Sequence, residues 1–198
     1  ILSVMTTIAA KSITNVTLTQ SLQGQHIGMC LYGLQSMSSK DDSVRGLLSI
    51  VTMMIAGCSA PLKAQEVGNA LYGLKGMKDD SLEVREVLSV LANKIHHCKS
   101  SLDGQAVGNA LYGLQRMSSD CYEVRGVLHA LTQKIHNSKE NLSAQAVSNA
   151  LYGLQRMNSS RTEVRDILSE LAIKIHNCEE DFSAQAVSIA LYGLQRMS

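Results

Sequence analysis

The sequence predicts an all-α fold, a right-handed α-solenoid of stacked helix-turn-helix repeats with a period of 40 residues. The strongest observation is a tetrapeptide, Leu-Tyr-Gly-Leu, that returns at a constant spacing. It begins at Leu31, Leu71, Leu111, Leu151 and Leu191. A fixed period of this size is typical of solenoids, in which each unit buries its apolar face only by stacking on its neighbours. The composition agrees, because the chain is rich in Leu, Ala and Met and contains a single proline.

The period divides the chain into a single solenoid of full and partial repeats. We expect a partial repeat at 1–20, full repeats at 21–60, 61–100, 101–140 and 141–180, and a partial repeat at 181–198. Solenoids usually end in capping repeats with a polar outer face, and neither end of this chain has one. We therefore expect a fragment of a longer array, with neighbouring repeats of the parent chain as contacts.

The first helix of a repeat is clearest in the fourth full unit. Ser143 is a suitable N-cap, and Val147, Leu151 and Leu154 follow at helical spacing. Gly153 costs the helix about 1 kcal/mol relative to Ala, so its return in every unit predicts a close approach of another helix. We expect these first helices over 24–37, 64–77, 104–117, 144–157 and 184–197.

The second helix of a repeat follows a polar turn, at 158–160 in the same unit. Glu163 in its first turn and Lys174 and His176 in its last turn suit the helix dipole. Its arginines are expected to form surface or inter-repeat ion pairs; they are Arg45, Arg85, Arg125 and Arg165. Its buried face is predicted to consist of Val164, Ile167, Leu168, Leu171 and Ile175.

Several classes of function find no support in the sequence. There is no catalytic constellation, no phosphate-binding glycine loop and no metal-ligand spacing, so we expect no enzyme activity, no cofactor and no metal. The longest apolar stretch, at 47–56, is too short to span a bilayer, which takes about 20 residues. The five cysteines lack disulfide geometry in a stacked array and favour reduced thiols inside the cell.

One polar stripe remains on the first helix after its apolar face is assigned. Amide side chains can bind base edges, a tyrosine ring can stack on a base, and arginine can contact phosphate. A structural role stays open as well, because tyrosine often packs between units and buried amides often satisfy backbone groups. The candidate residues for binding RNA or another partner are Gln105, Asn109, Tyr112, Arg116, Gln145, Ser148, Asn149, Tyr152, Arg156 and Arg196.

The charges are distributed unevenly between the two helices. The first-helix segments carry one acid, Glu66, and four cations, which are Lys75, Arg116, Arg156 and Arg196. This bias favours an anionic partner, whereas the net charge of +1 is far below the basic balance of strong RNA binders.

The phrase Phe-Ser-Ala-Gln-Ala-Val at 182–187, running into Ala-Leu-Tyr-Gly-Leu at 190–194, resembles a known repeat. It is similar to the first helix of octotricopeptide and related heptatricopeptide-like repeats, the helical hairpins of RAP-type proteins. That family has tryptophan where this chain has tyrosine, and a slightly shorter repeat. The resemblance implies a nuclear-encoded protein of a mitochondrion or plastid that binds single-stranded RNA and stabilises, processes or helps translate transcripts. It also implies a structural role for the aromatic residue.

Two hypotheses for function follow. The first is a non-catalytic protein that binds single-stranded RNA in an organelle. The alternative is a protein-binding scaffold or accessory subunit of a large organellar complex. The polar stripe hardly changes between consecutive repeats, which predicts low sequence specificity for any RNA that it binds.

Overall fold

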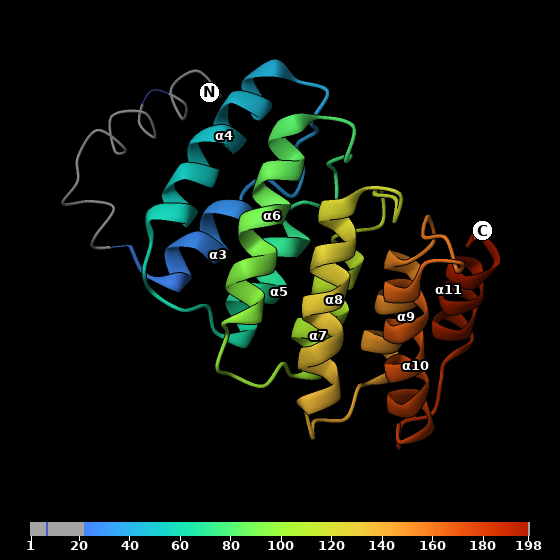
Figure 1. Ribbon diagram of the computed structural model, residues 1–198. Coiled ribbons are helices and arrows are strands. Elements are labelled where there is room, and N and C mark those ends of the chain that lie inside the picture. The colour runs from blue at the N-terminus through green and yellow to red at the C-terminus, as the bar shows by residue number, and fades with distance from the viewer. Residues whose placement is uncertain (1–6, 8–21, 198) are drawn as a thin grey trace.

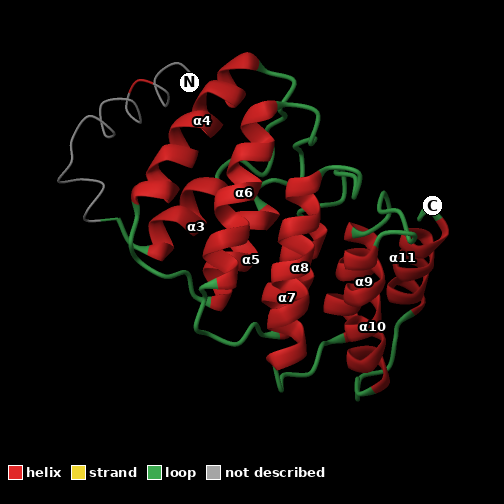
Figure 2. Ribbon diagram, viewed as in Figure 1, coloured by secondary structure: helices red, strands yellow, loops and turns green. Residues whose placement is uncertain are grey.

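The computed structural model describes residue 7 and residues 22–197, and these are all-helical. Figure 2 shows helices joined by loops, with no strand in the described part of the chain. The helices are α3 (Gly24–Tyr32), α4 (Asp42–Gly57), α5 (Ala64–Tyr72), α6 (Leu82–His96), α7 (Gly104–Tyr112), α8 (Tyr122–Asn137), α9 (Ala144–Gly153), α10 (Thr162–His176) and α11 (Ala184–Gln195). The partial repeat expected at 1–20 lies outside the described residues apart from Thr7.

The helices form two layers. The longer helices α4, α6, α8 and α10 pack side by side in one layer, and the shorter helices α3, α5, α7, α9 and α11 in the other (Figure 1). The core lies between the layers, where Leu71, Leu111 and Leu131 are fully buried. The predicted apolar face of α10 is confirmed by the burial of Val164, Ile167 and Leu171, whereas Leu168 and Ile175 at its edges are only half-buried. The helices thus pack on one another as a helical repeat does.

The short helices begin where the sequence predicts. The Ser143 hydroxyl accepts a hydrogen bond from the Ala146 amide at 3.1 Å, which confirms Ser143 as the N-cap of α9. Asp103 caps α7 in the same way, accepting from the Ala106 amide at 2.7 Å. Each cap satisfies a backbone donor that the first turn of a helix leaves without a partner.

The short helices end earlier than the apolar pattern predicts. α7 stops at Tyr112, and the chain continues in tighter turns in which Leu114 donates to the Leu111 carbonyl at 2.9 Å and Met117 to the Leu114 carbonyl at 2.9 Å. Bonds of this i→i+3 type turn the chain more sharply than an α-helix does. They keep both side chains buried, so the apolar pattern continues although the helix has ended.

The repeated glycines let the short helices touch backbone to backbone. A Cβ placed at Gly113 would overlap the carbonyl of Leu71, and one at Gly153 would overlap the carbonyl of Leu111. The atoms in the way belong to the backbone and cannot move aside as a side chain could. The predicted packing reason for this glycine is therefore confirmed.

Lysine ammonium groups join the long helices α6, α8 and α10 to the loop of the preceding unit. Lys134 donates to the Cys98 carbonyl at 2.5 Å, and Lys174 donates to the carbonyls of Ser138 at 2.5 Å and Glu140 at 2.9 Å. Lys174 was expected to stabilise its own helix end through the dipole. The structure shows in addition that it satisfies carbonyls of another unit.

The arginines of the long helices also cross between units. The Arg125 guanidinium lies 3.6 Å from the Glu163 carboxylate, and Arg45 lies 4.0 Å from Glu83. Arg125 also donates to the Ser119 carbonyl at 2.7 Å. These contacts confirm the inter-repeat ion pairs predicted for two of the four arginines.

The structure bears on two further expectations. The five cysteines are free thiols, as the sequence predicts. Among the described helices, none combines the length and the apolar character that a membrane span requires.

Candidate functional site

The repeated tyrosines form one continuous ladder across the layer of short helices. Successive rings of Tyr32, Tyr72, Tyr112, Tyr152 and Tyr192 have centroids 5.7, 5.7, 5.6 and 6.0 Å apart and are inclined by 18–21°. Near-parallel rings at this separation are in the favourable offset arrangement. The inner rings have a neighbour on each face. A base therefore finds no free face on Tyr112 or Tyr152, and the stacking role expected for these rings is not available in this arrangement.

The tyrosine hydroxyls remain at the edge of the ladder. Lys75 donates to the Tyr72 hydroxyl at 2.9 Å, and Arg196 donates to the Tyr192 hydroxyl at 3.0 Å. The hydroxyls of Tyr112 and Tyr152 make no hydrogen bond within the described residues. Two of the four predicted cations thus lie beside the ladder, and two inner hydroxyls are open to a ligand.

An amide-lined groove runs beside the ladder. It has a volume of about 580 Å³, and every lining residue is a tyrosine, glutamine or asparagine: Tyr32, Gln65, Asn69, Tyr72, Gln105, Asn109, Tyr112, Gln145 and Asn149. Two adjoining hollows of about 380 and 400 Å³ share Gln145 and Asn149 with it and extend it to α11. The structure therefore brings together the two amide positions that the sequence singled out.

The amide side chains of the groove have no hydrogen-bond partner among the described residues. The glutamine side chains are exposed and the asparagines are half-buried, and none of the six makes a hydrogen bond to another described residue. The alternative role, in which these amides bond to backbone groups, is not seen in the described part of the chain. Each carboxamide thus offers two donors and one acceptor to a ligand.

Ser148 lines the hollow that continues towards α11 but offers almost no surface to a ligand. It is 2% exposed, and its hydroxyl donates to the carbonyl of Ala144 in its own helix at 2.6 Å. Its position in the repeat explains this burial. At the equivalent position of the preceding unit, Gly108 packs against the backbone of Ala146 in the next short helix. The residue predicted as a contact therefore faces the neighbouring helix.

The predicted arginines lie in or next to the turns that follow the short helices. Arg116 and Arg156 follow the ends of α7 and α9, and both are exposed. Arg116 makes a long hydrogen bond of 3.4 Å to the Gly76 carbonyl, whereas Arg156 has no partner among the described residues. Arg196 lies 5.4 Å from the centroid of the Tyr192 ring. All three present a charge to solvent on the side of the short helices.

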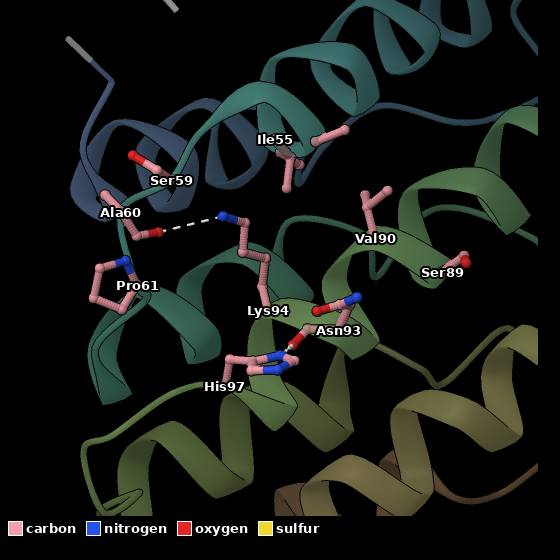
Figure 3. A pocket seen from close by; sticks show the side chains of 10 residues that line it. Ile55, Ser59, Ala60, Pro61, Ser89, Val90, Asn93, Lys94 and His97 are labelled. Carbon is pink, nitrogen blue, oxygen red and sulfur yellow. Dashed lines mark hydrogen bonds between the residues drawn. The ribbon is translucent and has the colours of Figure 1, made fainter. Parts of the chain in front are cut away.

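A separate pocket of about 540 Å³ lies between the ends of the long helices α4 and α6 (Figure 3). Lys94 reaches across it and donates to the carbonyl of Ala60 at 3.3 Å, while Asn93 and His97 lie beside Lys94 (Figure 3). The ammonium group is thus engaged in joining two units. The described residues include no group of His, Cys, Asp and Glu side chains arranged to hold a metal ion.

Packing of the tyrosine between units is the structural alternative left open by the sequence, but the sequence analysis did not predict that the rings stack on one another in one continuous ladder. The signal was present, since a tyrosine next to a glycine returns in every unit.

Comparison of the chain with known protein families, curated proteins and solved structures found no match.

Proposed function

We propose that the chain is a right-handed α-solenoid with a 40-residue period that binds single-stranded RNA, without catalysis, along the amide-lined groove. The organelle setting, a mitochondrion or plastid, is part of this proposal and rests on the resemblance given above. The observation that carries the binding proposal is the set of six unpartnered amides from three consecutive units, next to exposed cations.

Single-stranded RNA suits this groove better than a duplex. The bases of a single strand expose their edges, whereas the base edges of an RNA helix lie in grooves that side chains enter poorly. The ladder advances 5.6–6.0 Å per unit. A stacked strand advances only about 3.4 Å per nucleotide, so one nucleotide per unit requires an extended, unstacked strand.

The charge of the groove predicts a moderate and salt-dependent affinity. Arg116, Arg156 and Arg196 are exposed on the side of the short helices, and we expect them to contact the phosphates. Each phosphate contact on a single strand adds about 0.7 to the slope of log affinity against log salt. Three contacts therefore account for a slope of about 2.

The test is a salt titration with a labelled pool of single-stranded RNA, followed by fluorescence anisotropy. The triple variant Arg116→Ala, Arg156→Ala, Arg196→Ala is expected to bind more weakly and to lose a slope of about 2. A matched variant removes three exposed lysines whose side chains have no partner in the described part of the chain, Lys40, Lys99 and Lys139. It has the same net charge and should keep most of the affinity. No binding of the unaltered chain at low salt, or equal losses in both variants, rejects the proposal.

A protein-binding scaffold is the second candidate, and the near-neutral charge of the chain favours it, because a net charge of +1 is far below that of strong RNA binders. In that case a helical partner would dock on α11, where Leu191 is 60% exposed. The scaffold candidate predicts assembly that the double variant Leu191→Ser, Leu194→Ser abolishes, measured by analytical ultracentrifugation. RNA binding through the groove is expected to survive that change.

A further inference from the structure

The groove presents the same amide at three successive steps. Asn69, Asn109 and Asn149 line it at equivalent positions of three units. The two flanking units carry Met29 and Ile189 at this position, so the asparagine series ends on both sides. A ligand that follows the short helices therefore meets three identical polar positions between two apolar ones.

We infer that the groove selects a run of three adenines, one facing each asparagine. This inference rests on the RNA-binding function proposed above and names the base that the groove prefers. Identical side chains at consecutive steps select the same base at each step. The constant stripe, from which low sequence specificity is expected, would thus prefer a run of one type of base.

The lining composition points to the base. Specific contacts to guanine come typically from Arg or Lys, and contacts to the cytosine amino group from Glu or Asp. None of these residue types lines the main part of the groove, between Tyr32 and Asn149. Glu180 and Asp181 line only the hollow that continues towards α11. Asn and Gln pair with adenine in a bidentate way, since the amide oxygen accepts from the N6 amino group while the amide nitrogen donates to N7. In a single strand this edge is exposed, and the adenine can be bound edge-on.

The asparagines are better suited to this selection than the glutamines. Asn109 is half-buried and short, with neighbours of the same type in the units before and after it. The glutamines of the groove are exposed and longer, so they lose more rotamer entropy when they are fixed. We assign base selection to the asparagines, and the glutamines supply adaptable contacts to the same nucleotides.

The first experiment measures affinity for uridine oligomers of equal length that contain no adenine or a central run of one to four. Each of the first three adenines is expected to increase affinity about tenfold, and the fourth by no more than about twofold. Equal affinity for adenine, uridine and cytidine oligomers would overturn the inference but leave RNA binding intact. A preference for uridine or cytidine would also overturn it, whereas binding to none of the oligomers removes the proposed function as well.

The second experiment changes the middle position alone. Asn109→Asp leaves only acceptors, so it loses the bond to N7 and gains an acceptor for the cytosine amino group. The ratio of affinities for a central adenine-cytosine-adenine run and a triple-adenine run is expected to rise about tenfold or more. This ratio cancels the general effect of the added charge. Asn93→Asp, on the exposed face of α6, should leave the ratio unchanged, and so a ratio that stays constant in both variants overturns the assignment.

Discussion

The clearest prediction concerns the glycine that follows each ladder tyrosine, tested by Gly113→Ala. Propensity alone predicts that this change stabilises the protein by up to about 1 kcal/mol, because alanine is the better helix former. The backbone there is in the ordinary right-handed region, with φ −59° and ψ −25°, so alanine meets no backbone strain. The packing of the neighbouring helix predicts instead that the change destabilises the protein.

The size of the effect follows from the atoms around Gly113. An added Cβ would overlap the Leu71 carbonyl and lie 2.9 Å from the Tyr72 nitrogen, against ordinary contacts of 3.4 Å or more. Helices α5 and α7 must then separate, by a distance on the order of 1 Å, and a gap of this size forfeits a quarter to a half of the dispersion energy between them. Overpacking of this kind costs about 1–3 kcal/mol, and rigid backbone puts this site at the upper end, about 3 kcal/mol.

The measurement is urea unfolding followed by circular dichroism, compared with Gly46→Ala. Gly46 lies on the exposed face of α4, and an added Cβ there would meet no atom within 4 Å. That control is expected to stabilise the protein by up to about 1 kcal/mol. Gly113→Ala should lower the unfolding midpoint while Gly46→Ala raises it. If both raise the midpoint, the close approach of the short helices is not the reason for the glycine.

Two further predictions concern contacts between units. Lys134→Met leaves the Cys98 carbonyl without its charged donor and should lower the free energy of unfolding by about 1.5–3 kcal/mol, while Lys139→Met, at an exposed and unpartnered lysine, should change it little. Urea unfolding of the two variants measures the difference, and equal midpoints would contradict the role of Lys134. The Arg161 guanidinium, which donates to the Asp120 carboxylate at 2.9 Å, holds the pKa of that carboxyl below its usual 3.8. The stability from this pair is therefore present above pH 3.8 and is lost as the pH falls through the lowered pKa. Asp120→Asn should reduce the melting temperature slightly at pH 7 and not at all in strong acid, as thermal melts across pH would show.

Much of the fold could be predicted from the sequence because a repeat gives the same signal several times. The cap at Ser143, the polar turn after the short helix and the buried face of α10 each depend on local chemistry, and each was placed correctly. The end of the short helix was placed too late, because Leu154 and Met157 continue the apolar pattern at helical spacing. These residues are buried in a tight turn, and a buried turn gives the same spacing of apolar residues as a buried helix.

The candidate site was predictable only in part. Gln145 and Asn149 could be assigned to a polar stripe of the short helix from their spacing, and both line the groove. Their binding of a ligand stays a prediction. The burial of Ser148 depends on how closely the next helix approaches, and the sequence does not contain that distance. The stacking of Tyr152 between two other tyrosines depends on the same distance.

The repeated tetrapeptide sets the geometry of the groove although it supplies few of its contacts. Gly153 brings α9 against the carbonyl of Leu111, and this contact brings the Tyr112 and Tyr152 rings to a separation of 5.6 Å. Asn149 lies three residues before Tyr152, on the same face of the helix, so the amides must advance at about the step of the rings. A larger residue than glycine would lengthen that step as well as weaken the interface. Gly113→Ala should therefore weaken RNA binding more than its loss of stability explains, because a strand bound at one nucleotide per unit cannot match an uneven step.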